Sequence, residues 1–173
     1  DNSIYFSVGD FRNRPLAQST SSYFGKIIKI KYDTLESEIY SLVHRNHQGL
    51  YYSSLTDILI SKEHGPYGGD EINIIKYKET YGWPLSSSCN HYDGSFKIEA
   101  PLYKSHKEYG FKEPIFNWSA VSSIGVSEIA AIDEQINIYF VSTLRNKKGY
   151  LFKFNDDFSE YQIINEYEIG ERI

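Results

Sequence analysis

The sequence predicts an all-β fold, and three observations carry that prediction. Aromatic residues make up 16% of the 173 residues, with 16 Tyr and 10 Phe, and this composition favours strands over helices. Short apolar runs recur along the chain with turn residues between them, and at residues 26–31 polar and apolar residues alternate. No segment has the pattern of an amphipathic helix longer than two turns. Short strands at such spacing indicate a sandwich, a barrel or a propeller.

The expected strands share aromatic or β-branched residues and are bounded by turn residues. In the first half of the chain we expect them at residues 3–8, 26–31, 38–43, 50–53, 57–61 and 71–76. In the second half we expect them at residues 126–132, 136–142, 149–154 and 161–167. The similar strings at residues 4–6, 50–52 and 138–140 fit equivalent strands of successive blades, which ranks a propeller above a sandwich.

Residues 82–123 interrupt this pattern within what we expect to be a single domain spanning residues 1–173. Pro84, Pro101 and Pro114, together with three consecutive serines, predict a long irregular loop. A loop of this length in a compact domain is usually functional.

Charge and cysteine content exclude several classes of function. The net charge is −5, and no basic run is dense enough to neutralise a row of phosphates, so we expect no nucleic-acid partner. No stretch approaches the roughly 18 apolar residues of a membrane span. Cys89 is the one cysteine, which rules out an internal disulfide, and we expect it to be structural. The chain starts without methionine at Asp1, directly before a strand, so we expect a cut, a processed start or a gene fragment and not a natural domain beginning.

The most unusual segment lies between residues 60 and 84. Glycine permits backbone geometry that other residues resist, so carbonyl groups can be turned toward a ligand. A second unusual string, HRNHQG, occupies residues 44–49. Together the two predict a ligand or ion site at the ends of strands. The glycine-rich part comprises Gly65, Pro66, Gly68 and Gly69, followed by the acidic pair Asp70 and Glu71.

Four motifs in order carry a family resemblance. They are IYFSVGD at residues 4–10, HRNHQGL at 44–50, EHGPYGGDEIN at 63–73 and YGWP at 81–84. They resemble V-G-D, R-N-P-Q-G-L, E-H-G-P-x-G-G-D-E-I-N and Y-G-W-P of the soluble pyrroloquinoline quinone (PQQ)-dependent glucose and aldose sugar dehydrogenases, also called glucose/sorbosone dehydrogenases. His47 stands where that family has proline. In outline the resemblance runs from residue 3 to residue 173.

The resemblance implies a partial β-propeller, about three blades of a six-bladed one. It also implies oxidation of an aldose at C1, with hydride passing to PQQ that is polarised by calcium. The family's histidine base would lie upstream of Asp1, so we expect this chain to be inactive alone. Family members are commonly exported, which suggests a periplasmic or secreted protein. A partial propeller exposes blade faces, so we also expect self-association or a missing partner segment.

The resemblance assigns the candidate site residue by residue. PQQ carries three carboxylates, and guanidinium groups suit carboxylates because they donate two parallel hydrogen bonds. Calcium accepts main-chain carbonyl oxygens readily. The carbonyl groups of Gly65 and Pro66 would hold the ion at the quinone, and Glu71 with the Tyr81 carbonyl would hold a second, structural calcium. The implied cofactor contacts are Arg45, Asn46, Gln48, Trp118, Arg145 and Arg172.

Each of these assignments has an ordinary structural alternative. Arg45 would also fit a solvated turn, and Gly65 with Pro66 an ordinary bend. Glu71 would suit a salt bridge or a solvated strand start, Arg145 a hairpin charge, and Trp118 the core. Residues 119–128 depart from the family's P-S-I-A-P-S pattern, which weakens the wall next to Trp118. The alternative function is a non-catalytic β-propeller-like binding or adhesion module that takes up no PQQ.

The histidines do not follow a known zinc pattern. His44, His47 and His64 lie near the matched motifs, but their spacing fits no zinc signature on a helix. We therefore expect no zinc site from this sequence pattern. His91 and His106 fall in the long loop, where we expect them to be exposed to solvent.

Overall fold

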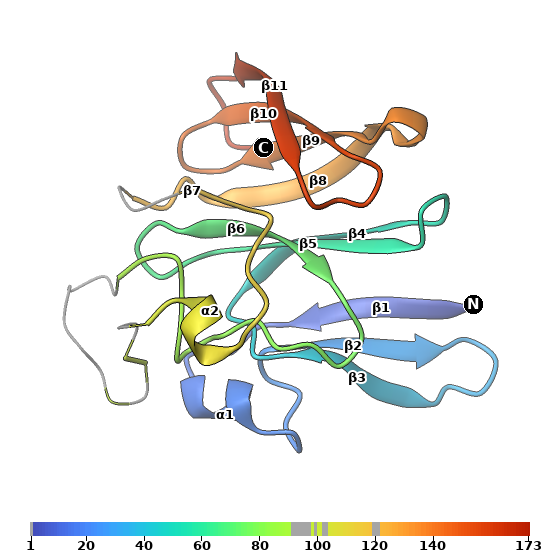
Figure 1. Cartoon of the computed structure of the whole chain (residues 1–173), viewed down its shortest axis with the longest axis vertical. Helices are drawn as coiled ribbons and strands as arrows, with labels where there is room; N and C mark the ends of the chain where they lie inside the picture. The colour runs from blue at the N-terminus through green and yellow to red at the C-terminus, as the bar shows by residue number, and fades with distance from the viewer. Residues whose placement is uncertain (1, 91–97, 99, 102–103, 119–121) are drawn as a thin grey trace.

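The computed structural model describes residues 2–90, 98, 100–101, 104–118 and 122–173. It is nearly all β, with three antiparallel sheets that follow one another along the chain (Figure 1). Among the described residues, no helix is long and apolar enough to cross a membrane. The helical elements are α1 (Arg14–Gln18), α2 (His106–Tyr109) and the 3-10 helix η1 (Glu134–Ile136).

Each sheet pairs strands that are adjacent in the chain. The first sheet has the order β1 (Ser3–Val8), β2 (Lys26–Lys31) and β3 (Ser37–Leu42). The second has the order β4 (His47–Ser53), β5 (Ile58–Glu63), β6 (Asp70–Ile75) and β7 (Phe116–Trp118). The third has the order β8 (Val126–Asp133), β9 (Ile138–Thr143), β10 (Lys148–Phe154) and β11 (Tyr161–Glu168).

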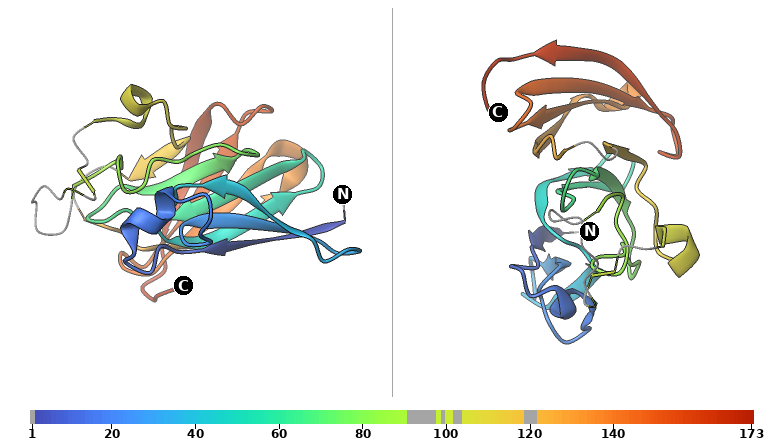
Figure 2. Two further views of the ribbon diagram at one scale, coloured as in Figure 1. Left: turned by 90° about the horizontal axis from the view of Figure 1, so that it is seen from below. Right: turned by 90° about the vertical axis from the view of Figure 1, so that its left-hand side faces the viewer.

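The sheets are arranged as blades of a propeller. β1 lies beside β4, and β4 lies beside β8, so the first strands of successive sheets come together. The views in Figure 2 show the sheets as separate, twisted layers. The predicted all-β fold and partial β-propeller are therefore confirmed.

One detail of the predicted blade repeat is wrong. The string at residues 138–140 lies in β9, the second strand of its sheet, whereas the strand equivalent to β1 and β4 is β8. Tyr139 is fully buried among other aromatic rings. The aromatic string therefore marks burial in the core and not a place at the centre of the propeller.

The expected strands form with small shifts at their ends, and the long loop contains two short elements. α2 begins at a capping box, in which Ser105 and Glu108 each bind the other's backbone N–H. β7 pairs antiparallel with β6 and places Trp118 opposite Asp70. The loop thus returns to complete the second sheet.

The main core lies between the second and third sheets. It is rich in aromatic rings, and Phe116 packs edge-on against Phe152 with ring centroids 5.2 Å apart. A smaller cluster joins the first and second sheets and includes Ile27, Leu59 and Tyr81. The buried members of the main core are Ile60, Ile72, Val126, Ile129, Tyr139, Val141, Tyr150, Phe152, Phe154 and Phe158.

Candidate functional site

The bend between β5 and β6 has a backbone that requires glycine. Gly68 and Gly69 have φ angles of 82° and 60°, in the left-handed region. A side chain at Gly65 would collide with the carbonyl oxygen of Gly68. The Gly65 N–H donates to Oδ1 of Asp70 at 3.1 Å, which closes the bend. We call residues 64–69 the glycine bend.

Asp70 fastens the glycine bend to the third sheet. The Ser123 hydroxyl donates to both carboxylate oxygens, at 2.8 and 2.9 Å. The backbone N–H groups of Gly125 and Val126 donate to Oδ2 at 2.8 and 3.2 Å. This fully buried carboxylate is thus held by neutral donors that surround it.

Arg45 lies against the same bend. Its Nη1 donates to the carbonyl oxygen of His64 at 2.9 Å, and its guanidinium lies 5.3 Å from the ring centre of Trp83. The Trp83 indole N–H donates to Oδ2 of Asp10 at 2.7 Å, and the Asp10 N–H donates to the Arg45 carbonyl at 2.7 Å. Residues from all four sequence motifs therefore meet at one place.

Asn46 and His64 support this arrangement from the other side. The His64 N–H donates to the Asn46 carbonyl at 2.9 Å, and the Asn46 amide nitrogen lies 3.4 Å from Nδ1 of His64. Nε2 of His64 donates to the Val126 carbonyl at 2.7 Å. Gln48 lies outside this group, because it is exposed at the irregularity where β4 pairs with β5.

A small cavity joins several of the predicted site residues. Its free volume of about 10 Å³ is close to the smallest space that admits one water molecule. The cavity therefore matches a single ion or water in size and is far smaller than a quinone. Its lining includes Arg45, Gly65, Glu71, Tyr81, Trp83 and His106.

Glu71 brings a buried acidic group to this cavity. It is only 4% exposed, and burial raises the pKa of its carboxyl to about 7. The Ser88 hydroxyl donates to Oε1 at 2.7 Å, and the Asn73 amide donates to Oε2 at 3.3 Å. A carboxylate beside main-chain carbonyl groups is a donor set that hard cations such as calcium prefer.

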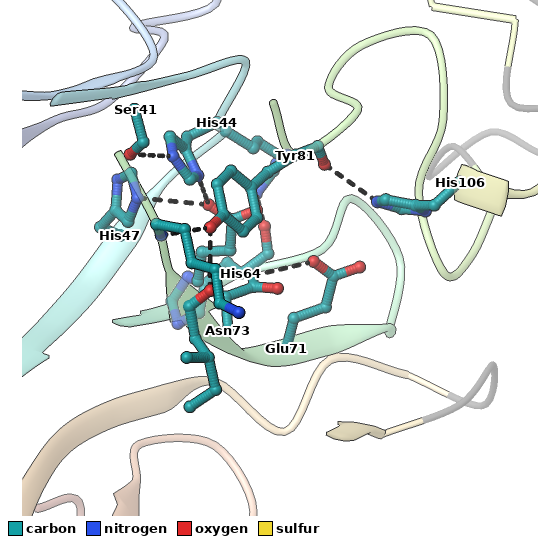
Figure 3. A network of polar contacts seen from close by, with 12 residues as sticks. Ser41, His44, His47, His64, Glu71, Asn73, Tyr81 and His106 are labelled. Carbon is teal, nitrogen blue, oxygen red and sulfur yellow. Dashed lines mark hydrogen bonds and ion pairs between the residues drawn. The ribbon is translucent and has the colours of Figure 1, made fainter. Parts of the chain in front are cut away.

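His106 is buried, so the expectation that it is exposed is wrong. Its Nε2 donates to the Tyr81 carbonyl at 2.9 Å (Figure 3). Its Nδ1 lies 3.0 Å from the Ser86 hydroxyl. The α2 capping box places His106 under the loop that carries Gly82, a position that the irregular pattern of the loop could not reveal. His91 lies outside the described residues.

Three further predicted residues do not line this cavity. Arg145 is exposed, and its backbone N–H donates to the Ile124 carbonyl at 2.9 Å. The residue after Ile124, Gly125, is one of those that bind the Asp70 carboxylate. Trp118 accepts a backbone hydrogen bond from Gly69 at 2.8 Å, while its ring packs on Tyr150 at 5.4 Å. Arg172 is exposed near the end of the chain and lines none of the described cavity.

A second cluster of buried polar side chains lies beside the cavity, whose lining includes Glu63. His44 and His47 surround Glu63, with Nδ1 of His44 3.2 Å and Nε2 of His47 3.5 Å from the same carboxylate oxygen (Figure 3). Burial lowers the pKa of both imidazoles to about 3 and raises the pKa of Glu63. Nε2 of His44 lies 2.8 Å from the Ser41 hydroxyl.

Several residues that build the site were not predicted as ligands of PQQ or calcium. Asp10, Asp70 and Trp83 lie within the matched motifs, so the motifs themselves were the available signal. Ser123 carries no such signal, because it lies in the segment that departs from the family pattern. Cys89 supports the bend, since its thiol donates to the Gly68 carbonyl at 2.8 Å, and burial raises its pKa.

The sequence matches the Glucose / Sorbosone dehydrogenase family over residues 1–173. The blade architecture and the meeting of the four motifs agree with this match. The chain belongs to the Glucose / Sorbosone dehydrogenase family.

Individual relatives show the same likeness. The chain is 31% identical over 170 residues to aldose sugar dehydrogenase YliI of Escherichia coli K12, which covers 89% of this chain and 45% of that protein. It is 30% identical over 160 residues to quinoprotein glucose dehydrogenase B of Acinetobacter calcoaceticus, covering 75% of this chain and 30% of that protein. The crystal structure of the soluble aldose sugar dehydrogenase of E. coli in its apo form superposes with a TM-score of 0.82 at 28% identity, over 100% of this chain and 54% of that one. The chain thus spans less than half the length of these curated relatives.

Proposed function

We propose that this chain supplies part of the PQQ and calcium site of a sugar dehydrogenase that oxidises an aldose at C1. The observation that carries the proposal is the contact between Arg45 and the glycine bend, in which the guanidinium donates to the carbonyl oxygen of His64 at 2.9 Å. Two relatives have names that describe an aldose sugar dehydrogenase and a quinoprotein glucose dehydrogenase.

Arg45 is the residue we assign to a PQQ carboxylate. A guanidinium has five N–H donors, and His64 accepts from one of them, so further donors are available for a carboxylate. The Trp83 ring beneath the guanidinium fixes its plane. Asn46, whose amide lies beside Nδ1 of His64, would add a neutral donor next to it.

The glycine bend is the part we assign to the first calcium ion. Its geometry requires glycine at Gly65, and Asp70 holds it in place, so the carbonyl groups of Gly65 and Pro66 would not need to reorganise on binding. When bound, PQQ would accept hydride and calcium would polarise the quinone. Residues of this chain would bind and orient both groups.

The remaining assignments are to the edge of the site and to a second calcium ion. Glu71 and Tyr81 line the same small cavity, which has room for one ion. His106 already donates to that carbonyl, whose second lone pair remains for a cation. Arg145, Arg172, Trp118 and Gln48 would complete the PQQ pocket from its rim.

Titration with PQQ tests the proposal. We expect the chain to bind PQQ in the presence of calcium, and binding to weaken when a chelator removes the ion. A reconstitution assay with PQQ, calcium and a dye acceptor should show no robust turnover by this chain alone, because it spans less than half the length of the enzymes it matches. Absence of PQQ uptake with calcium present would favour the binding or adhesion module instead.

Open blade faces lead us to propose self-association or a partner segment. Ile4 and Phe6 on β1 are 56% and 40% exposed, and Tyr161 and Tyr167 on β11 are also exposed. Exposed apolar surface of this kind favours association. Light scattering should detect a species larger than one chain of 20.1 kDa, and a stable monomer at high concentration would contradict this expectation.

A further inference from the structure

His44, His47 and Glu63 form a buried group that the proposed PQQ and calcium site does not use. Their candidate ligand atoms all lie within 4.8 Å of one another, and the two imidazole centroids are 4.3 Å apart. β4 and β5 pair so that His47 stands directly opposite Glu63. The group therefore has a fixed backbone frame.

His47 is the unusual member, because its buried ring has no hydrogen-bond partner in the described part of the chain. Its side chain is 1% exposed, and neither ring nitrogen makes a hydrogen bond to any described residue. Leaving such polar atoms unpaired in the interior is unfavourable. Its Nε2 faces a carboxylate oxygen of Glu63 at 3.5 Å, so a cation between these two atoms would satisfy both.

The distances suit a small transition-metal ion. Zinc binds imidazole nitrogen and carboxylate oxygen at about 2.0–2.2 Å, so tetrahedral ligands lie about 3.4 Å apart. The separations from Glu63 Oε2 are 3.2 Å to His44 and 3.5 Å to His47. Both imidazoles are neutral at ordinary pH, the form that binds metals.

The surroundings of His44 orient it as a ligand. The Ser41 hydroxyl lies 2.8 Å from Nε2 and can accept its proton, which leaves the Nδ1 lone pair directed at Glu63. The Tyr81 ring stacks on the His44 ring, with centroids 4.5 Å apart. A hydrogen bond from the second ring nitrogen, such as the one available to Ser41, commonly fixes a metal-binding imidazole.

We propose that His44, His47 and Glu63 bind one divalent transition-metal ion of the zinc class. Water would be the fourth ligand, because no other His, Cys, Asp or Glu of the described ranges joins the group. Two imidazoles make calcium a poor fit, since calcium prefers oxygen ligands. Arg45 and Asn46 lie between two of the ligands in sequence, so the ion would fasten the segment that carries them to β5.

Cobalt(II) and zinc titrations of the metal-free full chain test this proposal. We expect one ion per chain, with the intense visible absorption of tetrahedral cobalt, and we expect zinc but not calcium to displace it. His47→Gln and His44→Gln should each weaken binding by about 100-fold or more. Glu36→Gln is the control, because Glu36 pairs with Lys31 on the surface and takes no part in the group, and it should change the affinity less than threefold.

Two results would overturn the proposal. The first is a wild-type chain that takes up neither ion, and the second is His47→Gln that binds as tightly as wild type. His47→Pro restores the residue typical of the family and serves if the glutamine variant fails to fold. Thermal unfolding gives an independent reading, since zinc should raise the Tm of wild type and leave that of His47→Pro unchanged.

Discussion

The same two strands bury opposite kinds of chemistry at different points along their length. In their interior, β5 and β6 contribute Ile60 and Ile72 to the aromatic core. Where they meet the glycine bend, they contribute Glu63 and Glu71, which are equally well removed from solvent. Burial alone therefore does not distinguish the core from the candidate site. The two regions differ in the polarity of their buried side chains.

The core and the polar end of these strands contribute to the protein in different ways. Apolar burial in the core stabilises the fold directly. Buried carboxylates stabilise it only when their partners compensate for lost hydration. Asp70 has such partners in full, whereas burial raises the pKa of Glu71 to about 7. We expect changes in the core to alter stability and changes at the polar end to alter binding.

The largest expected effect is in the core. Phe152→Ala should lower the free energy of unfolding by about 3–5 kcal/mol, because it leaves a cavity between the second and third sheets. Urea denaturation measures this loss. Ile132→Ala is the control, since Ile132 is 63% exposed, and it should change stability by about 0.5 kcal/mol or less. Equal losses in the two variants would contradict the assignment of the core.

Asp70→Asn should lower both the stability of the protein and its affinity for PQQ. An amide retains one acceptor oxygen and presents an N–H₂ group to the donors of Ser123 and Gly125, so we expect a loss of about 2–4 kcal/mol. The glycine bend should also loosen, and calcium-dependent PQQ binding should weaken with it. Exposed Asp156→Asn should leave both quantities unchanged. An Asp70→Asn chain with wild-type stability would show that the bend is held by other contacts.

Replacing Lys62 is expected to raise the stability of the protein, whereas the two preceding variants lower it. Lys62 is fully buried, its Nζ has no hydrogen-bond partner among the described residues, and burial lowers its pKa to about 7. Lys62→Met should therefore raise stability by about 1–3 kcal/mol at pH 7.

The pH dependence of that gain follows from the lowered pKa. Between pH 7 and the usual lysine value of 10.5 the unfolded chain binds more protons than the folded one, so wild-type stability rises with pH in this window. The advantage of Lys62→Met should shrink over the same range. Urea denaturation at pH 7 and pH 9.5 measures it, and an advantage independent of pH would refute the assignment.

The sequence predicted the strands well because their signal is local. Alternation and turn residues placed β2 at residues 26–31 and separated β4 from β5 correctly. The motifs also predicted that Arg45 and the glycine bend would lie together. Whether a strand is the first or second of its blade depends on packing between sheets, which a local pattern does not show. The string at residues 138–140 therefore wrongly suggested a strand equivalent to β1 and β4.

The parts of the site that escaped prediction depend on contacts between distant residues. His106 is buried, and its ring donates a hydrogen bond to the Tyr81 carbonyl. No local sequence pattern indicates this contact. The zinc pattern considered for His44, His47 and His64 lacked Glu63, which strand register brings opposite His47. Gln48 and Arg172 are exposed, and their assignment to PQQ stays a prediction, as do the assignments of the other cofactor residues.

PQQ affinity in the presence of calcium, measured for wild type, Arg45→Met and the control Lys31→Met, tests whether Arg45 binds the cofactor. Lys31 pairs with Glu36 on the surface and is absent from the cavity lining. We predict that Arg45→Met weakens PQQ binding by about tenfold or more, the loss expected for a charge-assisted hydrogen bond, while Lys31→Met binds as wild type does. Equal PQQ affinity in Arg45→Met and Lys31→Met would contradict the central claim that Arg45 and the glycine bend form one cofactor site.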